Sequence, residues 1–136
     1  LTMDLNGLKG INERFGQLHG NRILAQVAKR LKQSCREYDY VARMGGDEFV
    51  LLLPGLRALD AKERMEELRY AVASAAMDAL HNEPLTVAIG LASFPKDGAD
   101  AETLLAEADR RMYLDKQDQK AGLSNKTVDI FASSSL

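Results

Sequence analysis

The stretch Gly45-Gly46-Asp47-Glu48-Phe49 joins two runs of mostly β-branched, aromatic and aliphatic residues, 40–44 before it and 49–53 after it. Adjacent glycines between such runs predict a tight hairpin turn, because glycine adopts positive φ without steric strain. The two acidic residues follow directly, so the tip of the predicted hairpin carries two carboxylates. A rigid turn with two acids and an unobstructed backbone is a place where a metal ion and a phosphate group can meet.

Length and composition indicate one folded domain. The 136 residues are enough for a sizeable core, and 46% hydrophobic with 28% charged residues is typical of a globular protein. A net charge of −2 argues against broad binding to nucleic acid, although a single nucleotide can still bind locally. The single cysteine, Cys35, excludes an intrachain disulfide and a cysteine-built zinc site. No apolar run reaches the length of a membrane span.

Further elements are predicted around the hairpin from helical spacing of apolar residues and from short apolar runs between turn residues. Asp60 is placed as the N-cap of the middle helix, and the polar segment 6–16 is expected to be a loop or a short helical turn. This order of elements predicts an α+β fold with the helices mainly on one face of the sheet. The expected helices cover residues 18–36, 60–79 and 101–116, and the expected strands cover residues 1–5, 40–44, 49–53, 85–94 and 127–131.

Asp4 is an acid near the end of the first, otherwise apolar, predicted strand. Taken alone, it is best interpreted as the first exposed residue of a loop, since buried carboxylates are rare unless they are paired or bound to metal. If this strand lies beside the hairpin, however, Asp4 and Asp47 meet at one edge of the sheet. Such oxygen ligands suit Mg²⁺, which binds one or two carboxylates together with substrate phosphates. Bridging ions of this kind stabilise the attacking and leaving oxygens in phosphoryl transfer.

Four segments, in order along nearly the whole chain, carry a family resemblance. Residues 4–12, 90–95 and 108–116 are similar to the motifs D-x-[DN]-x-[FL]-K-x-[IV]-N, G-[IV]-A-x-[YF]-P and A-D-x-A-[ML]-Y-x-A-K, and residues 45–49 carry the signature between them. Together they resemble the GGDEF family, the diguanylate cyclases. The family's usual opening, D-x-L-T-x-L-x-N-R, and the helix after it have no counterpart. We therefore expect a catalytic domain over residues 1–131 that lacks its N-terminal segment, with a disordered tail over residues 132–136.

The resemblance implies a palm-like, ferredoxin-like sandwich, with a central mixed but mainly antiparallel sheet and flanking helices, similar to nucleotidyl cyclase domains. Members condense two GTP molecules into cyclic di-GMP and pyrophosphate. Each domain holds one GTP, so the resemblance implies a homodimer, formed through an upstream region. It also implies Mg²⁺, with Mn²⁺ as the alternative. A cytoplasmic location is expected, as the output domain of a larger sensor, without nucleic acid or membrane contact.

Carried over residue by residue, the resemblance assigns the acidic site. Asp4 and Asp47 bind Mg²⁺ through their carboxylates, and Leu5 binds it through its backbone carbonyl. Asp47 also helps to deprotonate the attacking 3′-hydroxyl. Glu48 is a ligand of a second metal ion or a supporting acid.

The same carry-over assigns the substrate contacts. Lys9 and Lys116 match positions that contact phosphates, a task that suits point charges on long side chains. Gly45 and Gly46 let the triphosphate approach the hairpin backbone. Asn12 matches the residue that binds the guanine edge, because an amide both donates and accepts hydrogen bonds. The alternative for Asn12 is a turn-forming asparagine in a loop.

Asn21 departs from the family pattern, in which most members have an aspartate that accepts hydrogen bonds from guanine. Asn21 has one carbonyl acceptor and no negative charge, so a site built on it discriminates less sharply. A cyclic dinucleotide synthase with relaxed purine choice, which makes cyclic GMP-AMP, is therefore an alternative function.

Arg36 and Asp39 precede the hairpin in an R-x-x-D pattern. An Arg–Asp pair at this spacing is ordinarily a surface ion pair of little energetic value. In the GGDEF family this pattern is the inhibitory site for cyclic di-GMP, which makes the pair the candidate for product feedback.

Two further functions stay open. The chain could be a degenerate domain that senses GTP or cyclic di-GMP without turnover. It could also be a structural ferredoxin-like module, if the extended motif match were coincidence.

Overall fold

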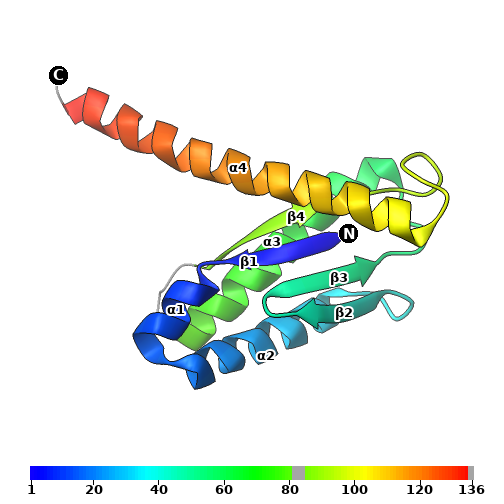
Figure 1. Cartoon of the computed structure of the whole chain (residues 1–136), viewed down its shortest axis with the longest axis horizontal. Helices are drawn as coiled ribbons and strands as arrows, with labels where there is room; N and C mark the ends of the chain where they lie inside the picture. The colour runs from blue at the N-terminus through cyan, green and yellow to red at the C-terminus, as the bar shows by residue number, and fades with distance from the viewer. Residues whose placement is uncertain (81–84, 135–136) are drawn as a thin grey trace.

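The fold is built on one antiparallel sheet (Figure 1). The structure is a computed structural model that describes residues 1–80 and 85–134. The sheet has the strand order β2-β3-β1-β4, and every strand pair found in these ranges is antiparallel. The prediction of a mainly antiparallel sheet with flanking helices is therefore confirmed. The strands are β1 (Thr2–Asn6), β2 (Tyr40–Gly45), β3 (Glu48–Leu52) and β4 (Thr86–Gly90).

Helices cover both faces of the sheet, so the expectation that they lie mainly on one face is wrong. α2 and α3 pack side by side behind the sheet, whereas α4 crosses its front over β4 and β1 (Figure 1). No helix in the described residues is long and apolar enough to cross a membrane. The helices are α1 (Leu8–Phe15), α2 (Gln17–Ser34), α3 (Ala58–Leu80) and α4 (Ala101–Ser134).

The period-two pleat of the strands explains how both faces are filled. Side chains of alternate strand residues point into one main core, where they meet the apolar faces of α2 and α3. On the other face, Ala88 is buried, and Gly90 leaves room for the backbone of α4 at Ala108 and Met112. The main core includes Met3, Leu5, Phe49, Leu51, Val87 and Ile89 from the strands and Ile23, Val27, Leu31, Leu68 and Val72 from the helices.

Several element boundaries differ from the sequence predictions. The segment expected as a loop or a short helical turn contains α1, an eight-residue helix whose Leu8 and Ile11 are buried. Asp60 is not an N-cap, because α3 begins at Ala58 and Asp60 lies in its first turn. The predicted strand over residues 127–131 is wrong, because α4 continues through Ser134. Residues 135 and 136 of the predicted tail lie outside the described residues.

Gly90 offers a direct test of the packing of α4. A methyl group at this position would overlap the α4 backbone at Ala108 and Met112, and a helix backbone cannot move aside as a flexible side chain does. We expect Gly90→Ala to lower the free energy of unfolding by about 2–3 kcal/mol, measured by urea denaturation. The control is Gly10→Ala, at an exposed helical position with open space around it, which should raise stability by about 0.5–1 kcal/mol. Equal stability of Gly90→Ala and the parent would contradict this packing.

Candidate functional site

The end of β1 and the hairpin bring the sequence-predicted acids together. Asp4, in the middle of β1, lies directly opposite Glu48, the first residue of β3. The backbone N–H of Leu5 donates to the carbonyl oxygen of Asp47 at 3.1 Å, which ties β1 to the turn. The turn residues are Gly46 and Asp47, since the preceding glycine closes β2.

Positive φ angles allow the hairpin to form this turn. Gly45 has φ 134° and Gly46 has φ 50°, both in the region that favours glycine. The pairing of β2 with β3 shifts register between Arg43 and Gly45, as in a β-bulge. The Nε of Arg43 donates to the carbonyl oxygen of Gly46 at 2.9 Å and so braces the turn. The backbone therefore presents Asp47 in a fixed position.

Asp4, Asp47 and Glu48 bring negative charges close together where β1 meets the hairpin, and Asp4 and Glu48 are partly buried. Burial raises the pKa of Asp4, and the adjoining Asp47 carboxyl raises it further, while Lys116 opposes the shift. The Nζ of Lys116 donates to Oδ2 of Asp4 at 3.3 Å. Burial also raises the pKa of Glu48, with added repulsion from the charges of Asp109, Asp4 and Asp47. A cation at this place would relieve the repulsion.

The donor set fits a magnesium ion that shares its ligands with a substrate. Among the described residues, no group of three or more His, Cys, Asp or Glu side chains is placed to hold a metal ion. Mg²⁺ does not need such a group, because it usually keeps waters and binds one or two carboxylates plus phosphates. In the described part of the chain, Oδ1 of Asp4 is buried and has no hydrogen-bond partner. This free oxygen beside Asp47 is a hard ligand of the kind that Mg²⁺ prefers.

Two cavities adjoin the acids and share three residues, Leu8, Lys9 and Asp47. The first, of about 300 Å³, has a basic lining and lies between α1, β1 and α4. The second, also of about 300 Å³, has amide side chains and lies between α1, α2 and the hairpin. The first is further lined by Leu5, Asn6, Gly7, Thr86, Lys116, Gln119 and Lys120. The second is further lined by Asn12, Gln17, Asn21, Leu24, Arg43 and Gly46.

Most sequence-predicted substrate residues line these cavities, but not all of them do. The predicted site residues Asp4, Gly45 and Glu48 line neither one, although Gly45 and Glu48 belong to the hairpin and Asp4 lies opposite Glu48. The sequence analysis missed the basic residues Arg43 and Lys120. Lys120 could have been found from its spacing, because it follows Lys116 by one helical turn and so lies on the same face of α4.

The side-chain amide of Asn12 packs against a glycine of α2. A side chain at Gly20 of α2 would overlap the Asn12 amide, so this glycine makes room for Asn12. Oδ1 of Asn12 is buried without a hydrogen-bond partner among the described residues. Asn12 lines the second cavity, while its amide oxygen is buried against Gly20.

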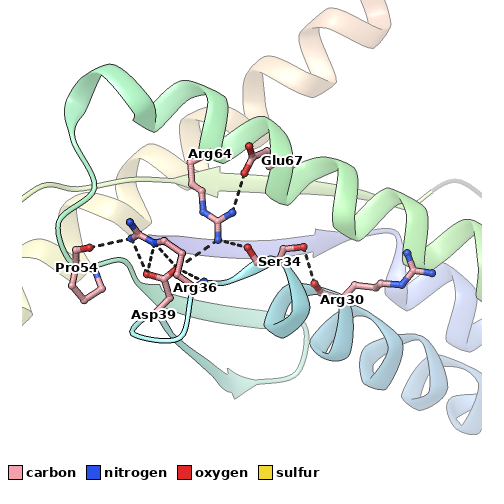
Figure 2. Close-up of polar contacts among 7 residues, drawn as sticks. All are labelled: Arg30, Ser34, Arg36, Asp39, Pro54, Arg64 and Glu67. Carbon is pink, nitrogen blue, oxygen red and sulfur yellow. Dashed lines mark hydrogen bonds and ion pairs between the residues drawn. The ribbon is translucent and has the colours of Figure 1, made fainter.

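Arg36 and Asp39 lie at a separate place, where α2 leads into β2 (Figure 2). Nε and Nη2 of Arg36 donate to the Asp39 carboxylate, and so does the backbone N–H of Arg36 at 2.8 Å. Arg64 of α3 approaches the same carboxylate at 3.6 Å, and the Asp39 side chain is 0% exposed. Burial alone would raise the pKa of Asp39, but the hydrogen bonds from Arg36 hold it below its ordinary value. The Arg36 guanidinium stays 35% exposed and lies over the ring of Tyr38.

Comparison with known proteins supports the same interpretation of the chain. Residues 1–122 match the family model described as "Diguanylate cyclase, GGDEF domain". The bifunctional diguanylate cyclase/cyclic di-GMP phosphodiesterase MucR of Pseudomonas aeruginosa is 35% identical over 122 residues, which make up 90% of this chain and 18% of that protein. The chain thus spans less than a fifth of the length of this relative.

Solved structures agree with the fold. The GGDEF domain of YfiN, also called TpbB, from Pseudomonas aeruginosa superposes with a TM-score of 0.75 at 31% identity, over 86% of this chain and 74% of that one. A sensory box/GGDEF family protein from Caulobacter crescentus has a TM-score of 0.76 at 30% identity, over 86% and 76% of the two chains. The prediction of a palm-like cyclase fold is confirmed by these neighbours, and the chain belongs to the diguanylate cyclase GGDEF domain family.

Proposed function

We propose that this domain condenses two GTP molecules into cyclic di-GMP and pyrophosphate, one GTP being held by each domain of a homodimer. The observation that carries the proposal is the pair of cavities that share Asp47 and Lys9 in their linings. The basic cavity, with Lys9, Lys116 and Lys120, suits a triphosphate. The amide-lined cavity, with Asn12 and Asn21, suits a purine edge.

Asp4 and Asp47 would hold Mg²⁺ through their carboxylates, and Leu5 would add its backbone carbonyl. When bound, the ion supplies charge that stabilises the phosphate oxygens on which negative charge develops. Glu48, opposite Asp4, adds a further acid or a ligand for a second ion. Mn²⁺ is the alternative ion for the same oxygen donors.

The protein side chains contribute position and proton transfer. Lys9 and Lys116 bind the triphosphate and neutralise the pyrophosphate as it leaves. Asp47 accepts the proton of the 3′-hydroxyl that the GTP of the partner domain presents to the α-phosphate. Gly45 and Gly46 keep side chains away from the triphosphate at the hairpin. This set performs phosphoryl transfer mainly by orientation and electrostatic stabilisation.

The two active sites must face each other, so dimerisation is part of the proposal. Because the chain spans 18% of the relative MucR, the parent protein can hold further domains that bring two copies together. We propose dimerisation through an upstream region and a role as the cytoplasmic output domain of a sensor. Two domains held at high effective concentration would turn over GTP faster than the free chain.

Product feedback at Arg36 and Asp39 is a second part of the proposal. The Arg36 side chain is 35% exposed, and a guanidinium group binds guanine or phosphate through charge-assisted hydrogen bonds. Asp39 is buried against Arg36 and Arg64, so it orients these two cations in addition to any contact with the ligand.

Asp47→Ala tests the catalytic assignment. We expect turnover of GTP with Mg²⁺ to fall at least about 100-fold, because a proton acceptor and a metal ligand are lost together. The measurement is product formation by mass spectrometry, in a fusion that forces the chain to dimerise. Stability should change by no more than about 0.5 kcal/mol, as for a turn residue. The control is Asp60→Ala, which removes a carboxylate outside both cavities. Full activity in Asp47→Ala would remove this mechanism.

Asn21→Asp tests purine choice. The added negative charge should strengthen acceptance of hydrogen bonds from guanine, and we expect the preference for GTP over ATP to rise about tenfold. Parent and variant are assayed with GTP alone and with GTP plus ATP, and the cyclic dinucleotides are identified by mass. A mixed GMP-AMP product from the parent that disappears in the variant would make Asn21 the determinant of relaxed specificity. Identical product ratios would show that Asn21 does not select the base.

Arg36→Ala tests the feedback site. We expect the affinity for cyclic di-GMP, measured by calorimetry, to fall about 10- to 100-fold while turnover without added product is unchanged, because charge-assisted hydrogen bonds are lost. A thermal scan accompanies the assay, since Asp39 loses its main partner. The matched control is Arg57→Ala, an exposed arginine that also pairs with an aspartate three residues on. Inhibition that is equally strong in Arg36→Ala would exclude feedback through this residue.

A further inference from the structure

Three polar side chains on one face of α4 run along the free edge of β4. Arg111, Asp115 and Gln119 are spaced four residues apart on the helix. Nη1 of Arg111 donates to the carbonyl oxygen of Leu91 at 2.7 Å, and Nε2 of Gln119 donates to that of Val87 at 2.8 Å. Between them, Oδ2 of Asp115 accepts the backbone N–H of Ile89 at 2.8 Å. The helix therefore supplies hydrogen-bond partners that a further strand would otherwise provide.

The spacing of the two elements explains this match. Four helical residues rise about 6 Å, and two strand residues rise about 6.6–6.8 Å. One helix face can therefore reach every second residue of the strand, here 87, 89 and 91. A shift of α4 by one residue would break all three contacts at once, so together they set its register on β4.

Asp115 is the centre of this arrangement. Its Oδ2 also accepts a hydrogen bond from Nη2 of Arg69 at 2.8 Å and one from Nε2 of Gln119 at 3.2 Å. Arg69, on α3, donates as well to the carbonyl oxygen of Val87 at 2.7 Å, so it links both helices to the strand. Gln119 in turn accepts from Nδ2 of Asn6, at the end of β1, at 3.0 Å. The family motif quoted above has alanine at the positions of Arg111 and Asp115, so these two contacts are additions in this chain.

The next residues along the helix belong to the proposed substrate site. Lys116 and Lys120 directly follow Asp115 and Gln119, and both line the basic cavity. Lys116 is 36% exposed and contacts Asp4 at 3.3 Å, so its position depends on where α4 lies. We infer that Asp115, supported by Arg69 and Gln119, is a positioning residue that holds Lys116 against Asp4 and aims it at the substrate phosphates. This inference rests on the proposed function for the phosphate role of Lys116.

The first test measures the position of Lys116 without any nucleotide. The free chain is treated briefly with an amine-reactive ester, and the labelling rate of each lysine is measured by mass spectrometry. In Asp115→Ala we expect Lys116 to react about 3- to 10-fold faster, because a charge-assisted network no longer holds its helix. Exposed Lys62 of α3 is the internal reference. The matched control is Arg110→Ala, whose 60% exposed side chain pairs with Glu107 on the same helix; this change should leave the labelling rate of Lys116 unaltered.

The second test measures turnover in the forced dimer. In Asp115→Ala the KM for GTP should rise about 5- to 10-fold with a smaller change in kcat, as expected when a binding contact is lost. The double variant Asp115→Ala/Lys116→Ala should have the KM of Lys116→Ala alone, because the first change acts through the second residue. Loss of stability alone would not produce this non-additivity.

The outcomes separate the inference from the proposed function. A folded Asp115→Ala variant with an unchanged Lys116 labelling rate overturns the inference, whether or not GTP is turned over. Faster labelling of Lys116 in Asp115→Ala supports the positioning role. If the unmutated forced dimer makes no cyclic dinucleotide, that result contradicts the cyclase proposal and leaves the positioning role intact. If Asp115→Ala does not fold, Asp115→Asn replaces it, since the amide keeps the size of the side chain but loses the negative charge that pairs with Arg69. An unchanged Lys116 rate in that variant likewise overturns the inference.

Discussion

The pleat of β1 is the constraint on which the rest of the site depends. β1 lies between β3 and β4, so its side chains must alternate between two packed faces. Met3 and Leu5 point into the main core, and Asp4 between them is therefore directed to the face that α4 covers. A carboxylate on a central strand is costly to bury, and here Lys116 offsets part of that cost, whereas the neighbouring Asp47 adds to it. The core thus determines where the acidic site lies.

The helix α4 connects this acidic site with the open edge of the sheet. Small residues on both elements allow α4 to pack closely on β4, namely Ala108 on the helix and Gly90 on the strand. Its polar residues then serve two purposes at neighbouring positions. Asp115 and Gln119 bind the edge of β4, while Lys116 and Lys120 face the basic cavity. Residues that bind the strand edge and residues that face the cavity alternate along one helix because successive residues differ by about 100° in direction.

Sequence reasoning predicted the hairpin, the family and seven of the sixteen residues that line the two cavities, because these depend on local motifs. It left α1 open as a loop or a short helical turn, because this segment is too short for a clear helical period and is stabilised by burying Leu8 and Ile11. The strand expected over residues 127–131 failed because β propensity is a weak guide when a helix already leads into the segment. Arg111 and Asp115 look like an ordinary solvated helix face in the sequence. Their contact with β4 depends on tertiary packing, which no local pattern encodes.

The covered edge of β4 also limits how the sheet can grow. An uncovered edge strand is a template on which another polypeptide can add a strand. With the α4 side chains bound along β4, the other end of the sheet, β2, is the edge that can accept an added strand. There the register shift near Gly45 interrupts regular pairing, which leaves the stretch from Tyr40 to Arg43 as the regular part of that edge. Sheet extension by a partner or by a second copy is therefore confined to one short stretch, at the opposite edge of the sheet from the α4 lysines.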